Sequence, residues 1–307
     1  MSEQVNLCCC GKPGKVYLRH AGRWFCEQCY EQYVLVRVKK YLRQHKLYNK
    51  RLRALLALSG GKDSAVLLYV LKKLYRNNIY IITLYIDEGI EGYSSRMRSL
   101  ARQYAEQYSD QHIEQRFRDW IGMDFPAALE KIRKKVHVLS PCSFCTVIKR
   151  RIMDEIARRE AVDVLFTGHN LTDFVVSALI NLFSGNYKRL VRLLVRQETN
   201  LFPPRHWPLL YLTAVELQEY ARLHGIDTSY GTCPLKTGIR KYLEHVLAEL
   251  EQHSPTVQHN VFSVLQKLSA QLQVQHAEIY TCKYCGWITS SKDRVCSFCK
   301  LKRLLEQ

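Results

Sequence analysis

The sequence has no long apolar segment and comparatively few acidic residues. Its longest largely apolar run, IYIITLYI at residues 79–86, is too short to cross a lipid bilayer. The first residues, MSEQVNL, lack the basic region and the apolar core of a secretory signal. These absences predict a soluble, cytoplasmic chain with no membrane partner.

Acidic residues number 28 against 46 lysines and arginines, which leaves a formal net charge of +18. From Arg37 to Arg53 there are eight basic residues and no acidic one, interleaved with tyrosines. A charge run of this kind is usually a solvated helix face, but the size of the overall excess favours a polyanionic partner. We therefore expect RNA or DNA to bind through its phosphates.

The chain has 307 residues and 47% hydrophobic content, which is enough to bury a full core and excludes a disordered protein. We expect one large domain with small appendages. The predicted divisions are an N-terminal zinc knuckle at residues 1–35, a basic helical segment at 36–53, a catalytic domain at 54–275 and a C-terminal zinc ribbon at 276–307.

Twelve cysteines, most of them in C-x-x-C pairs, indicate metal ligands or redox groups in a reducing compartment. The C-terminal spacing C-x2-C-x10-C-x2-C predicts a closed tetrahedral Zn²⁺ site. Its four ligands are Cys282, Cys285, Cys296 and Cys299.

A second zinc knuckle is expected near the N-terminus, where Cys26 and Cys29 form one clear pair. The other pair must come from Cys8, Cys9 and Cys10. Adjacent cysteines rarely share one metal because their side chains diverge, so we assign Cys8 and Cys10 as the ligands. Both zinc sites are expected to be structural, since a closed sulfur shell leaves no position for a substrate.

Between the two knuckles, short apolar runs alternate with segments of helical spacing. RALLALS, IYIITLYI, HIEQRF and VDVLFTG are typical of strands, and the segments between them are typical of helices. This alternation predicts an α/β fold with a parallel sheet covered on both faces. Ligands of such sheets bind beyond the carboxyl ends of the strands, where SGGKDS, DEGIEGY and GHNLTD lie.

The loop SGGKDS follows the first of these strands and precedes a helix. Two glycines allow a tight turn, and the helix N-terminus presents unpaired N–H groups to an anion. The loop is not a Walker A sequence, because Leu56 and Asp63 stand where that pattern needs a glycine and a Ser or Thr. The alternative is an ordinary glycine turn capped by Asp63 or Ser64. The context favours a phosphate site.

These motifs together resemble the tRNA 2-thiolation enzymes of the PP-loop ATP pyrophosphatase family. The resemblance lies in the N-terminal knuckle, LSGGKDS, IDEGIEGY, PCSFC…KRRIM, TGHN, a CP dipeptide at Cys233 and the C-terminal ribbon, in family order. It implies an adenine nucleotide α-hydrolase-like domain between the two knuckles. It also implies cleavage of ATP between its α and β phosphates, with Mg²⁺. The implied ATP-binding residues are Ser59, Gly60, Gly61, Lys62, Asp63, Ser64, Asp87, Gly168 and His169.

The resemblance further implies a [4Fe-4S] cluster held by Cys142, Cys145 and Cys233, with one iron left open. From the residues alone, a redox C-x-x-C pair, or a zinc site completed by Cys233 and a histidine, is equally compatible. Lys149 and Asp173 correspond to polar active-site residues of the family, although Lys149 also fits an exposed basic helix face. In the implied reaction, ATP adenylates the C2 oxygen of a uridine, and sulfur then displaces AMP to give 2-thiouridine.

The chain departs from the family pattern at several positions. Thr172 and Phe174 flank Asp173 where the family usually has D-D-E after GHNL, and Thr146 replaces a frequent glycine after the C-x-x-C pair. Trp207 stands in place of a lysine in a K-P-L tripeptide. These differences predict a divergent member with altered polar contacts near the site.

The motifs favour the wobble uridine at tRNA position 34 as the target, with the T-loop uridine 54 or an anticodon-loop cytidine as alternatives. The sulfur donor is left open between sulfide, a persulfide and a ubiquitin-like carrier protein. The family's habit predicts a homodimer. Two further classes stay open: a PP-loop enzyme acting on a free nucleotide or small acid, and a non-catalytic zinc-stabilised RNA-binding protein.

Overall fold

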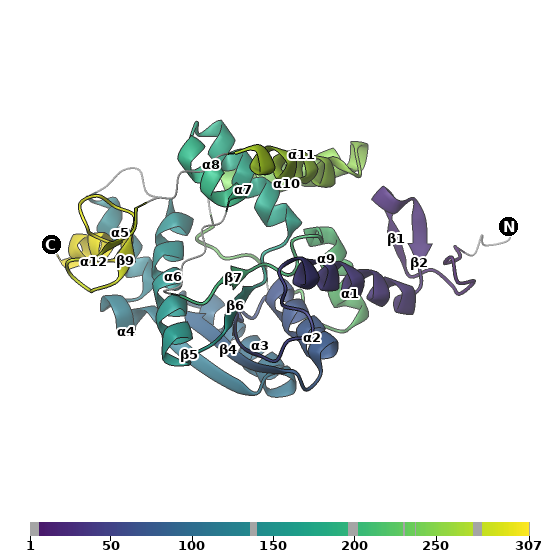
Figure 1. The fold of residues 1–307 in the computed structure, drawn as a ribbon, viewed down its shortest axis with the longest axis horizontal. Coiled ribbons are helices and arrows are strands. Elements are labelled where there is room, and N and C mark those ends of the chain that lie inside the picture. Colours follow the sequence, from purple (N-terminus) through teal and green to yellow (C-terminus); the bar gives the residue numbers. More distant parts are fainter. Residues whose placement is uncertain are drawn as a thin grey trace.

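The computed structural model describes residues 6–135, 140–195, 202–229, 231–236, 238–272 and 278–306. Within these residues, five parallel strands form a sheet in the order β5-β4-β3-β6-β7 (Figure 1). The predicted α/β class with a parallel sheet is confirmed. The strands are β3 (Leu52–Ala57), β4 (Ile79–Asp87), β5 (Gln111–Arg116), β6 (Val164–Thr167) and β7 (Arg205–His206).

Two helical layers cover the sheet because successive side chains of each strand point to opposite faces. In β3, Ala54 and Leu56 pack with one layer, and Leu55 packs with the other. The first layer contains α1 (Glu27–Gln44), α2 (Lys62–Tyr75), α3 (Tyr93–Tyr108) and α9 (Ala214–Leu223). The second contains α4 (Phe117–Ile121), α5 (Phe125–Arg133), α6 (Pro141–Arg159) and α12 (Ser297–Glu306).

A third helical group extends from the sheet and has its own small apolar core. Phe174 of α7 packs edge-on against Phe262 of α11, with ring centres 5.2 Å apart. Leu243 and Leu247 of α10 complete the buried part of this core. The group consists of α7 (Leu171–Phe183), α8 (Tyr187–Leu194), α10 (Ile239–His253) and α11 (Val257–Gln271), and lies at the top of Figure 1.

Small hairpins lie near the two ends of the chain. The N-terminal hairpin pairs β1 (Val16–Leu18) with β2 (Arg23–Phe25) around the short helix η1 (Arg19–Ala21). The C-terminal hairpin pairs β8 (Tyr280–Thr281) with β9 (Ile288–Thr289) and leads into α12. Each hairpin carries a four-cysteine group, as the predicted knuckles at both ends require.

The boundaries of α1 differ from the predicted helical segment at 36–53. The helix runs from Glu27 to Gln44, so the division placed between residues 35 and 36 lies inside it. The remaining basic residues occupy turns and the start of β3. The division placed at residues 275–276 lies outside the described residues. No helix among the described residues is both long and apolar enough to span a membrane.

Candidate active site

The SGGKDS loop connects β3 to α2 and is fixed by its own serines. Ser64 Oγ donates to the carbonyl oxygen of Gly61 at 2.9 Å and lies 3.1 Å from Ser59 Oγ. Gly60 has φ +79°, and a Cβ there would lie 2.2 Å from the carbonyl oxygen of Met97, so only glycine fits. Gly61 is the N-cap of α2 and has no side chain that could cap it, so the positive end of the helix dipole faces this loop.

A second loop, GHN after β6, lies directly against the SGGKDS loop. A Cβ on Gly168 would stand 2.9 Å from the backbone nitrogen of Ser64. Asn170 Nδ2 donates to Asp63 Oδ2 at 3.4 Å, while Lys62 Nζ donates to Asp63 Oδ1 at 2.8 Å. Burial raises the pKa of Asp63, and the Lys62 ammonium opposes that rise. The two loops therefore share one polar surface at the carboxyl end of the sheet.

The end of β4 brings two buried carboxylates, those of Asp87 and Glu88, to the same edge. Asp87 accepts from the backbone N–H of Gly89 at 2.8 Å and from the guanidinium of Arg98. The carbonyl oxygen of Glu88 accepts from the N–H of Phe125 at 2.8 Å, which anchors the loop to α5. Sequence reasoning did not single out Glu88, although its place directly after a buried strand was an available signal.

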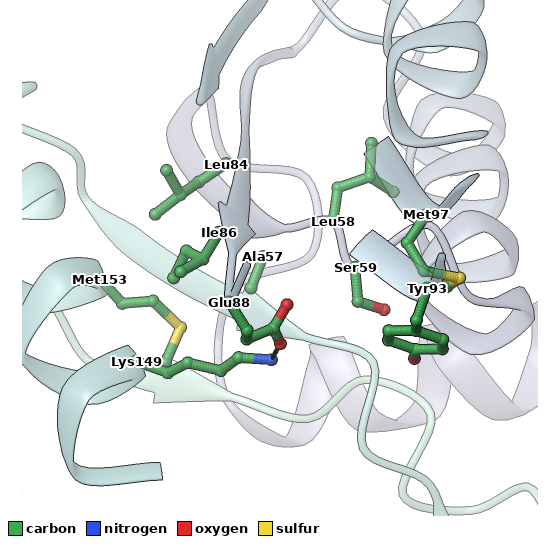
Figure 2. Close-up of a pocket in the computed structure, with 10 residues that line it drawn as sticks. All are labelled: Ala57, Leu58, Ser59, Leu84, Ile86, Glu88, Tyr93, Met97, Lys149 and Met153. Atoms are coloured by element: carbon green, nitrogen blue, oxygen red, sulfur yellow. Dashed lines mark ion pairs between the residues drawn. The ribbon is translucent and has the colours of Figure 1, made fainter. Parts of the chain in front are cut away.

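A pocket of about 80 Å³ lies between the ends of β3 and β4, α3 and α6 (Figure 2). Lys149 of α6 forms an ion pair with Glu88 there. Burial disfavours the charged form of Lys149, but the carboxylate of Glu88, together with Cys145 and Tyr93, outweighs burial and raises the pKa of Lys149. Burial, with Glu88, also raises the pKa of Tyr93 to about 12. The lining residues are Ala57, Leu58, Ser59, Leu84, Ile86, Glu88, Tyr93, Met97, Lys149 and Met153.

Removing the ammonium of Lys149 should destabilise the protein, because Glu88 would remain buried as an unpaired carboxylate. For Lys149→Met we expect a loss of about 2 kcal/mol in the free energy of unfolding. This is below the value for fully buried pairs, since the Lys149 side chain is 32% exposed. Urea denaturation measures it. The exposed Lys302 offers the matched control, Lys302→Met, and equal stabilities of the two variants would contradict the prediction.

Cys142 and Cys145 lie three residues apart in the first turns of α6, on one side of the helix. Burial raises the pKa of Cys145 to about 12 and also raises the pKa of Cys233, which lies between α9 and α10. Cys142 is an electrostatic neighbour of both of these thiols, and Cys145 and Cys233 pack against the same apolar core. The fold thus brings Cys233 into the neighbourhood of the helical pair from about 90 residues downstream.

The two terminal cysteine groups are arranged more tightly. In each group all four sulfur atoms lie within 4.8 Å of one another. Zn–S bonds of 2.3 Å in a tetrahedron place sulfurs about 3.8 Å apart; the distance from Cys10 Sγ to Cys26 Sγ is 3.5 Å, and that from Cys285 Sγ to Cys296 Sγ is 3.7 Å. The groups are Cys8, Cys10, Cys26 and Cys29, and Cys282, Cys285, Cys296 and Cys299. Cys9 is exposed and belongs to neither group.

Among the described residues, Cys142, Cys145 and Cys233 do not form a group of that tightness. At least one pair of their sulfur atoms is therefore farther apart than two ligands of one zinc ion. A centre with several metal atoms spans a wider set of sulfurs than a single ion does, so the donor set is compatible with an iron–sulfur cluster.

His169 lies in the loop just before α7, and Asp173 lies in the first turn of that helix. His169 Nδ1 lies 2.8 Å from Thr167 Oγ1, and burial lowers the pKa of His169. Asp173 forms a capping box with Asn170: its Oδ2 accepts from the Asn170 N–H at 3.2 Å, and its own N–H donates to Asn170 Oδ1 at 3.0 Å. Its other oxygen lies 4.0 Å from Arg240. Asp173 thus fixes the helix end that borders the phosphate loop.

Of the residues that depart from the family pattern, Thr172 and Phe174 have contacts away from this edge, whereas Thr146 and Trp207 lie beside site residues. Thr172 Oγ1 accepts from the N–H of Ala214 at 3.0 Å and so joins α7 to α9. Phe174 is buried against α11. Thr146 Oγ1 donates to the carbonyl oxygen of Cys142 at 2.7 Å, within α6. The Trp207 ring lies 5.3 Å from that of His169 and covers one side of the GHN loop.

The sheet, its order and the loop after β3 define a PP-loop nucleotide-binding protein, and residues 32–230 match the model of the PP-loop domain family. A probable sulfurtransferase of Methanocaldococcus jannaschii is 30% identical over 98% of this chain and 90% of that protein. The tRNA-5-methyluridine(54) 2-sulfurtransferase of Pyrococcus horikoshii is 32% identical over 95% of this chain and 91% of that protein.

A solved structure shares the whole architecture. The U34-tRNA thiolase NcsA from Methanococcus maripaludis with its [4Fe-4S] cluster covers 98% of this chain and 96% of its own, with a TM-score of 0.82 and 26% identity. The chain therefore belongs to the PP-loop family, within its group of tRNA 2-thiolation proteins. The resemblance read from the motifs is confirmed.

Proposed function

We propose that this protein is an ATP-dependent tRNA sulfurtransferase that replaces the C2 oxygen of a uridine with sulfur. One observation carries the proposal. The phosphate loop and the neighbourhood of Cys142, Cys145 and Cys233 lie at the carboxyl edge of the same sheet, joined by the pocket that holds Glu88 and Lys149. An activating nucleotide and a sulfur source can thus meet over one base.

The residues of the phosphate loop account for the activation step. The C2 oxygen of the uridine attacks the α-phosphorus of ATP, and pyrophosphate leaves with Mg²⁺. The N-terminal end of α2, with its partial positive charge, binds the negative charge, and Gly60 lets the backbone approach it. We infer that Asp87 contributes to the Mg²⁺ site and that Gly168 and His169 border the nucleotide. Sulfur at the oxidation level of sulfide then attacks C2, and AMP departs with the former C2 oxygen.

Cys142, Cys145 and Cys233 would hold a [4Fe-4S] cluster in this proposal. The donor set fits, because Cys142 and Cys145 share one side of α6 and Cys233 packs against the same apolar core as Cys145. When bound, such a cluster supplies an iron with no protein ligand at which sulfur can be presented. Lys149 lies beside this position, paired with Glu88, and is placed to stabilise negative charge there.

A transfer RNA partner is supported by exposed basic residues in two places. The basic stripe on and after α1 leaves Lys40, Arg43, Lys46, Lys50 and Arg51 exposed. On α8, Lys188, Arg189 and Arg192 are exposed next to the exposed rings of Phe183 and Tyr187. Cations bind phosphates, and aromatic rings stack on unpaired bases, so α8 has the chemistry of a surface for single-stranded RNA.

Neutralising α8 should weaken tRNA binding and reduce its dependence on salt. We expect Lys188→Gln/Arg189→Gln to lower the slope of log K against log salt by roughly 1 to 2. Binding titrations at several salt concentrations measure the slope. The control Lys72→Gln/Arg76→Gln removes the same charge at the C-terminal end of α2. This end of the helix lies away from the SGGKDS loop, at the amino edge of the sheet. A slope that falls equally in both variants would contradict the assignment.

The wobble position is our first target for the reaction, because the solved U34 thiolase matches nearly the whole chain. The 32% identity to a uridine-54 enzyme makes the T-loop the second candidate. Mass spectrometry of tRNA nucleosides and fragments, after deletion and restoration of this protein, separates them. If 2-thiouridine is unchanged at both positions, the proposal fails.

ATP binding separates the enzyme from a non-catalytic RNA-binding protein with the same fold. A ligand of the folded state raises the unfolding temperature, so ATP with Mg²⁺ should protect the chain from thermal unfolding.

The zinc atoms of the two cysteine groups, a cytoplasmic location, a homodimer and the identity of the sulfur donor remain predictions. Metal analysis, fractionation, light scattering and assays with each donor test them respectively.

A further inference from the structure

Three residues outside the active site have the composition of a metal site. The ligand atoms of His20, Glu216 and His259 all lie within 4.8 Å of one another. His20 belongs to η1 of the N-terminal hairpin, Glu216 to α9 and His259 to α11. These elements are far apart in the sequence, and none of the sequence motifs includes the three residues.

The geometry is close to that of a bound ion. His20 Nε2 lies 3.7 Å from Glu216 Oε1, while ligands on a tetrahedral zinc ion at 2.0–2.1 Å are about 3.3 Å apart. The rings of His20 and His259 stack with their centres 4.9 Å apart. A ligand atom of each ring lies within 4.8 Å of the Glu216 carboxylate. Side-chain rotation alone can complete such a site.

His259 supplies an independent observation. Both of its ring nitrogens are buried and have no hydrogen-bond partner within the described structure. A buried polar atom without a partner costs roughly 1–3 kcal/mol, so native proteins rarely leave one without an ion or water. A metal ion coordinated by one of these nitrogens would give it the partner that it lacks.

The surroundings hold the carboxylate in place and favour a cation. Glu216 is 2% exposed; its Oε2 accepts from the N–H of Thr213 at 2.6 Å and its Oε1 from the hydroxyl of Tyr33. Hydrogen bonds of this kind hold a metal ligand in a fixed orientation. Burial, followed by the charge of Glu216, raises the pKa of Glu251, so a second carboxylate lies nearby. The guanidinium of Arg37, 4.3 Å from the Tyr33 ring centre, is a positive charge that opposes a cation here.

We propose that His20, Glu216 and His259 bind a third zinc ion, separate from the two cysteine groups. Two imidazoles and one carboxylate match the ligand preference of Zn²⁺ and leave one position for water. The ion would tie the N-terminal hairpin to α9 of the catalytic domain and to α11. Its role is to fix the basic helix α1, which follows the hairpin, against the domain that binds the nucleotide.

The proposal is tested by comparing the zinc content per chain of full-length variants with that of the full-length wild type. We expect His259→Gln and His20→Gln each to lose one zinc atom per chain, and the double variant to lose no more than that one. The exposed His253 provides the control His253→Gln, which should keep the wild-type content. Because only differences are compared, the result does not depend on the proposed reaction or on the metal in the cysteine groups.

Cobalt provides a second readout. The protein is first loaded with zinc and then treated with a chelator, so that the cysteine groups keep their zinc and the third site is empty. Cobalt titrated into this protein should give the weak visible bands of a nitrogen and oxygen site, without the sulfur-to-cobalt band of a thiolate site. In His259→Gln the apparent affinity should fall by more than the roughly 10- to 100-fold typical of losing a second-shell partner. Equal zinc contents of wild type and both single variants, with folded proteins by circular dichroism, would show that the three residues are polar packing only.

Discussion

Replacing Cys233 with serine is expected to reduce the iron and sulfide content of the anaerobically reconstituted protein from about four of each per chain to near zero. A serine hydroxyl cannot replace a thiolate on iron, and two ligands from one helical turn do not hold a cluster. Thiolation of tRNA should fall by at least about 1,000-fold, since the reaction then lacks its sulfur site. Inductively coupled plasma analysis and nucleoside mass spectrometry measure the two effects.

The spare thiol at the N-terminus is the matched control for this change. Cys9 is exposed and lies outside both four-cysteine groups, so Cys9→Ser should keep its iron, its zinc and its activity. A reconstituted Cys233→Ser protein with the wild-type iron content would show that Cys233 is not a ligand. Loss of zinc instead of iron would favour the alternative zinc site at the central cysteines.

Replacing Gly60 with alanine should abolish protection by ATP. The residue has φ +79°, which costs an L-residue roughly 1–2 kcal/mol, and the new Cβ would overlap the carbonyl oxygen of Met97 in α3. Since that oxygen belongs to the backbone, the loop must move, and the N–H groups of α2 lose their alignment. We expect the shift in unfolding temperature caused by ATP with Mg²⁺ to disappear, as measured by differential scanning fluorimetry.

Gly122 separates the effect of backbone strain from that of the loop. It has φ +78°, and nothing lies within 4 Å of a Cβ built there. Gly122→Ala should therefore lower the unfolding temperature through strain alone and keep the full shift with ATP. If Gly60→Ala retains that shift, the SGGKDS loop is a structural turn and the enzyme proposal is weakened.

The local parts of the site could be predicted because their signals are short in sequence. The glycine pair before a helix, the C-x-x-C spacings and the alternation of strands and helices each depend on neighbours within a few residues. The position of Glu88 directly after a buried strand was a local signal, but its pairing with Lys149 of another element was not. The departures at Thr172 and Phe174 suggested altered active-site contacts, whereas their contacts are with α9 and α11.

The sequence by itself determined the fold class, the phosphate loop and the two terminal cysteine groups, since local spacing and periodicity encode them. Only the tertiary structure decided that Cys233 lies near Cys145, that Lys149 pairs with Glu88, and that His20 and His259 meet at a buried carboxylate. Those contacts join segments tens to hundreds of residues apart. They depend on how the helical layers pack on the sheet, and no local pattern of residues records that packing.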